Sequence, residues 1–188
     1  MNSMKRLMFS TLFLSAVCLS AVGCGQSSTE PTASSDANSA AESATKPTAA
    51  ASEIILTSEP AGAKEVIAAR ESSQDEEEVV VVGRIGGSEN PWIDGRAAFS
   101  IVDNSLKACS DIPGDGCEKP WDYCCETDKL PGATALVKVV DADGTLIKED
   151  ARKLLNLKEL QTVVVKGKAK RDDSGNLTVF AKQVFVRK

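Results

Sequence analysis

The sequence predicts a mainly β domain of five strands, with one helix between the third and fourth strands and another before the first. From Val79 onward, apolar residues recur with a period of two in several short runs. Clusters of Asp, Gly and Asn separate these runs and are typical of turns. One segment, from Thr145 to Asn156, has helical spacing instead. Together these patterns predict the order β, β, β, α, β, β.

Residues 1–23 are expected to be a signal peptide outside the fold. Lys5-Arg6 supplies the positive start, Leu7 to Leu19 the apolar stretch, and Ala21-Val22-Gly23 the cleavage site before Cys24. The apolar stretch is shorter than the roughly 20 residues that a membrane-spanning helix needs. We therefore expect a lipoprotein whose mature chain begins with a lipidated Cys24. An ordinary secretory signal is the alternative.

Residues 24–52 follow as a predicted disordered tether between the lipid and the domain. Ser, Thr, Ala and Pro dominate this segment, which contains no aromatic residue. Such a composition buries too little apolar surface to offset the entropy lost on ordering. Residues 53–188 are then the length of one domain.

The first predicted helix follows Ser58, which can cap it, and Pro60, which suits its first turn. Its apolar and long side chains recur at helical spacing, at Ala63, Val66, Ile67 and Arg70. The first strand, Val79 to Ile85, contains Gly83, and a glycine inside a strand indicates a bulge or a bend.

The second and third strands are predicted at Ala97 to Asp103 and Thr134 to Asp141. Thr145 can cap the next helix, and Asn156 can end it in a left-handed conformation. One face of this helix would carry Ile147, Ala151, Leu154 and Leu155. The last two strands are expected at Thr162 to Lys170 and Leu177 to Val186, joined by a polar turn at Asp173 to Asn176.

Four sequence pieces, VVVVGRIGG, AAFSIVD, ATALVKVVDADG and VVVKGKAKRDDSGNLTVFAKQVFV, carry this pattern over residues 79–186. Their order resembles the OB-fold, a five-stranded, partly open barrel, and the preceding helix is similar to that of small exported bacterial OB-fold proteins. The resemblance implies ligand binding on strands two and three and in the loops joining strands one to two and four to five. A generic small barrel, or an α+β sheet with the same order, is the alternative.

A cysteine-rich insertion at residues 104–132 separates the second and third strands and is far longer than a hairpin loop. It contains CSDIPGDGCEKPWDYCCE, with Cys109, Cys117, Cys124 and Cys125. In an oxidising exported compartment we expect two disulfides that link the first two cysteines to the last two, in an order left open. The alternatives are a thiolate site for Zn or Cu(I), or a redox-active Cys124-Cys125 pair.

The acidic residues of the insertion fit no calcium-loop spacing, so we expect them to be solvated. They are Asp111, Asp115, Glu118, Asp122, Glu126 and Asp128.

Six further residues are candidates for ligand binding. Aromatic rings could stack on a ligand, or could pack under the insertion as a small second core. Lysines that alternate along a strand share one side, which could bind an anion or could be a solvated face. The candidates are Trp92, Trp121, Tyr123, Lys166, Lys168 and Lys170.

Composition narrows the function. The chain has no histidine, which excludes Ser/His/Asp and Cys/His catalysis, His-ligated metals and c-type haem attachment. From Val79 to the end there are 17 Lys and Arg against 16 Asp and Glu, a charge balance that disfavours nucleic-acid binding.

We therefore expect a noncatalytic lipoprotein of the cell envelope, anchored on the periplasmic face or in the outer membrane. Its domain would bind a small ligand or an envelope protein without a cofactor. A thiolate protein that binds Zn or Cu, or that exchanges electrons, is the alternative, and a nucleic-acid-binding OB-fold is a remote one.

Overall fold

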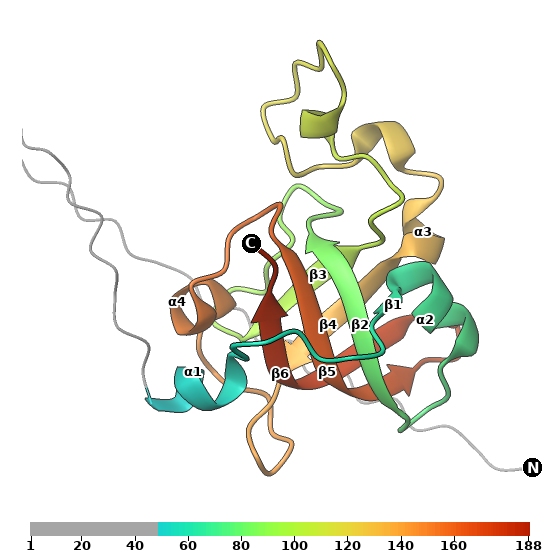
Figure 1. The fold of residues 1–188 in the computed structure, drawn as a ribbon. Helices are drawn as coiled ribbons and strands as arrows, with labels where there is room; N and C mark the ends of the chain where they lie inside the picture. Colours follow the sequence, from blue (N-terminus) through green and yellow to red (C-terminus); the bar gives the residue numbers. More distant parts are fainter. Residues whose placement is uncertain (1–48) are drawn as a thin grey trace, which may run out of the picture. The chain divides into compact units, whose positions relative to one another are not determined.

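The computed structural model describes residues 49–188, and the predicted signal peptide, Cys24 and nearly all of the predicted tether lie outside them. Figure 1 shows strands that curve into a barrel, with short helices at its margins. The strands are β1 (Lys64–Glu65), β2 (Glu78–Ile85), β3 (Ala98–Val102), β4 (Thr134–Val139), β5 (Thr162–Arg171) and β6 (Leu177–Val186). The α-helices are α1 (Ala49–Ile54), α2 (Val66–Ser72), α3 (Leu130–Ala133) and α4 (Ala151–Leu155), and two 3₁₀ turns are η1 (Cys109–Asp111) and η2 (Cys124–Glu126).

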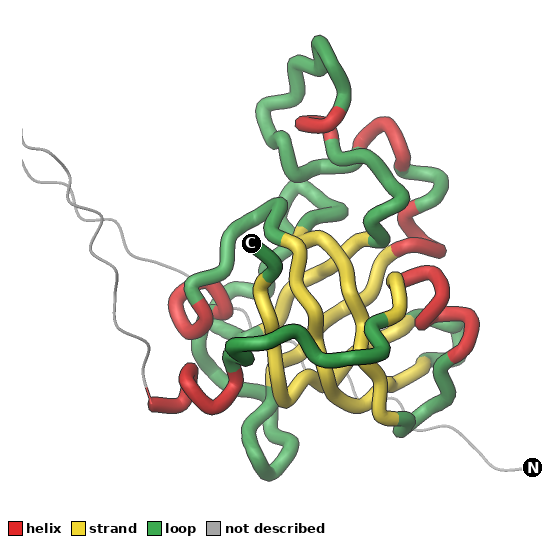
Figure 2. The backbone as a smooth tube through the Cα atoms, in the orientation of Figure 1, coloured by secondary structure: helices red, strands yellow, loops and turns green. Residues whose placement is uncertain are grey.

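Five strands close the barrel, and their pairing confirms the OB-fold topology (Figure 2). β2 pairs antiparallel with β5 over Glu78 to Arg84, and then with β3 at Arg84 and Ile85. β3 pairs antiparallel with β4, β4 pairs parallel with β6, and β6 pairs antiparallel with β5. The two-residue strand β1 adds to the outside of β2 in parallel.

The period-two pattern of the strands fills the barrel. Alternate side chains point inward, and the buried positions include Val79, Val81, Val137, Val139, Val163, Val165, Val179 and Ala181. Helix α4 adds Leu154 and Leu155 to this core. Phe99 and Trp92 also belong to it, with ring centroids 5.7 Å apart.

Close approaches of backbone explain the two strand glycines. A Cβ on Gly83 would lie 2.9 Å from the Val102 carbonyl oxygen and 3.0 Å from a Val66 methyl group, so Gly83 lets β3 and α2 pack tightly against β2. The bulge predicted there lies elsewhere: the register shift is between Lys166 and Gly167 in β5. A Cβ on Gly167 would lie 2.0 Å from the Phe180 carbonyl oxygen.

The helix predicted before the first strand exists but starts later than predicted. Ser58 and Pro60 precede it, Lys64 and Glu65 pair with β2, and α2 begins at Val66. Regular structure also begins earlier than expected, because α1 covers the last four residues of the predicted tether.

The helix predicted between the third and fourth strands is confirmed, but the capping residue predicted for it is wrong. The capping side chain is Asp150, which accepts a hydrogen bond from the Arg152 N–H at 2.9 Å, whereas Thr145 lies in the preceding turn. Asn156 ends the helix at φ 52°, in the predicted left-handed conformation.

A second buried cluster lies between the barrel and the cysteine-rich insertion. It consists of Val102, Leu106, Ala108, Tyr123 and Ala133. Within residues 49–188, none of the helices has the length and apolar character needed to cross a bilayer.

Candidate thiolate site

The insertion is attached to the end of β2 by polar contacts and by close backbone packing. Arg84 Nη1 donates to Asp111 Oδ2 at 2.5 Å, and Trp121 Nε1 donates to the Glu89 carbonyl at 3.1 Å. Gly86 has room only for hydrogen, because a Cβ there would lie 2.7 Å from the Trp121 carbonyl oxygen. These contacts fix the two arms of the insertion, the first around Asp111 and the second around Trp121, against the barrel. The tip of the insertion projects beyond the strands (Figure 1).

Tyr123 holds the second arm in place. Its ring is fully buried in the cluster beneath the insertion. Burial raises the pKa of the phenol to about 12, and the hydroxyl has no hydrogen-bond partner among the described residues. The next residue is Cys124, so the packing of Tyr123 sets where that thiol lies.

Backbone hydrogen bonds then bring the two arms side by side. The Cys109 N–H donates to the Asp122 carbonyl at 2.8 Å, and the Ser110 N–H donates to the Pro120 carbonyl at 3.0 Å. Because Cys109 stands opposite Asp122, its side chain reaches the thiol of Cys124. Residues 15 apart in the chain thus become neighbours.

Three sulfur atoms meet at this point. Cys124 Sγ lies 3.2 Å from Cys109 Sγ and 3.2 Å from Cys117 Sγ, whereas Cys125 Sγ lies 3.9 Å from it and outside the cluster. A disulfide bond is about 2.05 Å long. All four cysteines of residues 49–188 are free thiols, so the two predicted disulfides are absent from this structure.

Asp115 lies beside the three thiols, although it is exposed, as expected for a solvated residue of the insertion. One carboxylate oxygen of Asp115 and the sulfurs of Cys109, Cys117 and Cys124 all lie within 4.8 Å of one another. Asp111 forms an ion pair with Arg84. A Cys-only search of the sequence misses Asp115, although its position two residues before Cys117 is the signal of a tight Asx turn.

Hydrogen bonding and burial stabilise the neutral thiols. Hydrogen bonds to Cys124, Cys109 and Asp115 raise the pKa of Cys117, and desolvation raises the pKa of the buried Cys109. Both thiols are therefore protonated at neutral pH in the absence of a cation. A metal ion that binds thiolates would have to displace these protons, so its affinity would rise with pH.

No family model matches the chain, and no curated protein matches it. The chain is similar to several solved structures. They include the hypothetical protein ygiW from Escherichia coli, at 15% identity and a TM-score of 0.33, covering 68% of this chain and 94% of that one. The mitochondrial single-stranded DNA-binding protein Rim1 from Saccharomyces cerevisiae matches at 15% identity and 0.33, covering 61% of this chain and 98% of its own. The strand pairing, and not these likenesses, establishes the fold.

The candidate stacking aromatics are structural where the side chain is buried. Trp92 is buried in the barrel core, where Nε1 donates to Glu159 Oε1 at 2.6 Å and Arg152 lies over the ring. Tyr123 is the centre of the second cluster, as the small-core alternative predicted. Trp121 is half-buried and anchors the insertion through Glu89. Trp92 and Tyr123 therefore offer no ring surface to a ligand.

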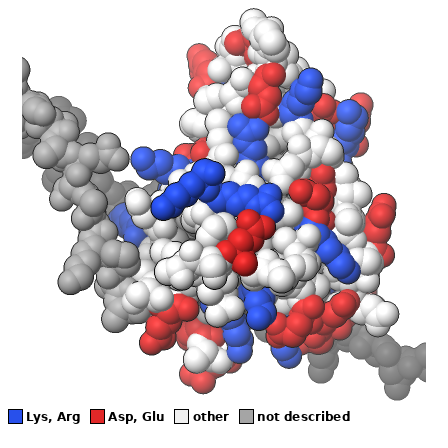
Figure 3. Space-filling model, viewed as in Figure 1, with Lys and Arg blue, Asp and Glu red and all other residues white. Residues whose placement is uncertain are grey.

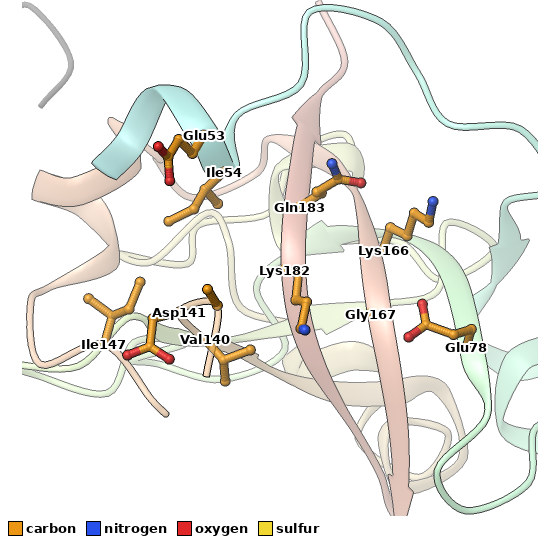
Figure 4. Close-up of a pocket in the computed structure, with 11 residues that line it drawn as sticks. Glu53, Ile54, Glu78, Val140, Asp141, Ile147, Lys166, Gly167, Lys182 and Gln183 are labelled. Carbon is orange, nitrogen blue, oxygen red and sulfur yellow. The ribbon is translucent and has the colours of Figure 1, made fainter. Parts of the chain in front are cut away.

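The three lysines of β5 lie on the outside of the barrel among carboxylates. Lys168 and Lys170 pair with Glu76, and Lys170 also pairs with Asp75. Lys166 borders a groove of about 440 Å³ with Lys182, Glu78 and Asp141 (Figure 4). Basic and acidic side chains are interspersed on the face seen in Figure 3. Because of this mixture, neither the groove nor this face has the predominantly positive charge that a polyanion site needs.

The barrel face that the OB-fold resemblance assigns to ligands carries a groove of about 590 Å³. Ser100, Leu136 and Thr178 line it from β3, β4 and β6. Its cation, Arg70, donates to the Thr134 carbonyl at 2.9 Å. The groove lining contains no aromatic ring on which a base could stack.

Proposed function

We propose that this chain is a noncatalytic, lipid-anchored OB-fold protein of the cell envelope that binds one thiophilic metal ion, Zn²⁺ or Cu⁺, in its insertion. The observation that carries the proposal is the gathering of three thiol sulfurs and one carboxylate oxygen within 4.8 Å. Thiolates favour Zn²⁺ and Cu⁺ over hard cations, and neither ion requires histidine.

The spacing of the four groups supports a shared ion. Zn–S bonds are about 2.3 Å long, so two thiolates on one tetrahedral zinc lie about 3.8 Å apart. The observed sulfur separations of 3.2 Å and the outer limit of 4.8 Å bracket that value.

The cysteines themselves test the proposal, because they differ in position while sharing their chemistry. Each of three substitutions should lower the affinity for Zn²⁺ or Cu⁺ by at least about tenfold, because each removes a side chain that binds the ion directly. They are Cys109→Ser, Cys117→Ser and Cys124→Ser. Cys125→Ser is the matched control and should bind like the wild type, because Cys125 lies outside the cluster. Metal analysis measures how much ion each variant binds, and competition with a chelator measures its affinity.

An equal loss of metal affinity in all four variants would contradict the assignment of Cys125 as a residue that does not bind the ion. Wild-type protein that takes up no stoichiometric Zn²⁺ or Cu⁺ under reducing conditions would overturn the metal site itself. A nucleic-acid role is not proposed, because the folded part is close to neutral and the barrel groove lacks stacking rings.

The envelope location rests on the sequence around Cys24, and it has its own test. Cys24→Ser should abolish lipid attachment, because the thiol receives the lipid before the signal peptide is cleaved. Metabolic labelling with a fatty acid should give a labelled wild type and an unlabelled variant. Label retained in the variant would refute the lipoprotein assignment and leave the metal site untouched.

A further inference from the structure

We propose that the thiolate site transfers its metal ion to a partner protein that presents exposed cysteine thiols. Asp115 is the ligand that dissociates during this transfer. The inference rests on the proposed metal site. It differs from the usual alternative for four protein ligands, a closed structural site that retains its ion.

The four groups of the site divide into a fixed side and an open side. Cys109 is buried, and its backbone is held by the hydrogen bond to Asp122. Cys117, Cys124 and Asp115 are all more exposed than Cys109. An ion held among them would therefore face solvent on one side, where a second molecule could reach it.

Asp115 is the weakest member of the set. Its Oδ1 already accepts the Cys117 N–H at 2.8 Å, and its own N–H donates to the Ile112 carbonyl at 3.1 Å. The turn thus occupies one of the two carboxylate oxygens. A carboxylate is also a hard ligand, which soft ions hold less firmly than a thiolate. Replacement of Asp115 by an incoming thiolate is the exchange that costs least.

A hollow adjoins the site at one of its ligands, Cys117. Its volume is about 280 Å³, and Glu89, Cys117, Glu118, Lys119 and Asp122 line it. Its lining comes from the insertion and from Glu89 in the loop between β2 and β3. Lys119 pairs with Glu89 in this lining, so Glu118 and Asp122 remain as its acidic side chains without an ion pair among the described residues, and they favour a partner with basic residues around its cysteines.

The exchange needs no electron transfer. The acceptor thiol loses its proton to solvent, and its sulfur bonds to the ion as the bond to the Asp115 carboxylate breaks. Further acceptor thiolates then replace the thiolates of this chain, which take up protons from solvent. The ion keeps its oxidation state throughout.

Transfer kinetics from the Zn²⁺-loaded, full-length protein to a small dithiol test the inference. The rate should rise in proportion to dithiol concentration, because the acceptor attacks before the ion leaves. Asp115→Cys, which supplies a fourth thiolate, should still bind one Zn²⁺ but release it at least about tenfold more slowly. Asp128→Asn is the control for a carboxylate lost elsewhere in the insertion, and its rate should match the wild type.

A transfer rate that does not depend on dithiol concentration would overturn the inference, as would an unchanged rate in Asp115→Cys. Equilibrium Zn²⁺ content, measured on the same samples, separates this failure from failure of the proposed function. Full Zn²⁺ loading with slow release that does not depend on dithiol concentration would indicate a closed site that binds the ion without transferring it.

Discussion

At the scale of single residues, Asp103 shows how a buried carboxylate joins three parts of the chain. It is 3% exposed and follows the last residue of β3. Its Oδ2 accepts the Ile67 N–H of α2 at 2.8 Å, and its Oδ1 accepts the Ser105 N–H and hydroxyl. Because both oxygens are satisfied, the burial of this charge is compensated. The insertion therefore leaves the barrel from a fixed point.

Gly83 is the residue whose replacement most directly tests the packing of the barrel. Gly83→Val should lower the free energy of unfolding by about 1–3 kcal/mol, because the new side chain would meet the Val102 carbonyl and the side chains of Val66 and Ile101. Urea denaturation measures the change. Gly132→Ala is the control, since a Cβ there meets nothing within 4 Å, and its unfolding midpoint should stay near that of the wild type. A Gly83→Val midpoint equal to the wild-type value would show that β3 and α2 can move away without cost.

The residues that sequence reasoning placed correctly are those with a local signal. Asn156 follows an apolar helical face and takes the left-handed conformation expected of it. Asp115 has no such signal as a ligand, because its neighbours in space, Cys109 and Cys124, come together only through the pairing of the two arms. The sequence identified Gly83 as special because a strand glycine indicates a bulge or a bend, whereas the structure explains it by the close approach of Val102 and Val66, and the bulge lies at Gly167.

At the scale of elements, α4 depends on one capping group. Asp150 accepts hydrogen bonds from the Arg152 N–H and from its guanidinium, and Arg152 also reaches Asp94. Arg152 lies over Trp92 as well, so this cap connects α4 to the loop between β2 and β3. The hydrogen bonds from Arg152 lower the pKa of Asp150 to about 2.

The lowered pKa predicts an acid-dependent contribution to stability. A carboxyl group whose pKa is lower in the folded state stabilises the fold above its unfolded pKa, which is 3.8 for Asp150, and this contribution is lost as the pH falls toward about 2. Asp150→Asn can still cap the helix but cannot titrate. The difference in free energy of unfolding between wild type and Asp150→Asn should therefore shrink between pH 4 and pH 2, as measured by urea denaturation. A constant difference over that range would contradict the assigned pKa.

Element order was predictable because the strands and α4 carry strong, continuous patterns. The beginning of α2 was not, since Ser58 and Pro60 satisfy the rules for a helix start while the chain instead pairs Lys64 and Glu65 with β2. The conformation of the insertion was also beyond local reasoning. Its shape depends on the burial of Tyr123 and on the pairing of Arg84 with Asp111, which are both contacts distant in sequence.

At the scale of the whole molecule, the barrel and the thiolate site are separate in composition. The barrel core consists of aliphatic and aromatic side chains, whereas the insertion carries all the cysteines of residues 49–188. The proposed metal-binding chemistry thus lies in a loop added between the second and third strands of the OB-fold. We therefore expect substitutions of the cysteines at the proposed metal site to leave the barrel folded.

The state of the four thiols in protein isolated from the cell envelope without reductant tests this account most directly. Mass spectrometry under non-denaturing conditions should show one bound Zn²⁺ or Cu⁺, and the denatured chain should have the mass of four reduced cysteines. A chelator should release the ion and make the thiols open to alkylation. A denatured mass about four hydrogens lower, as two disulfide bonds require, with no stoichiometric metal in the native protein, would contradict the account.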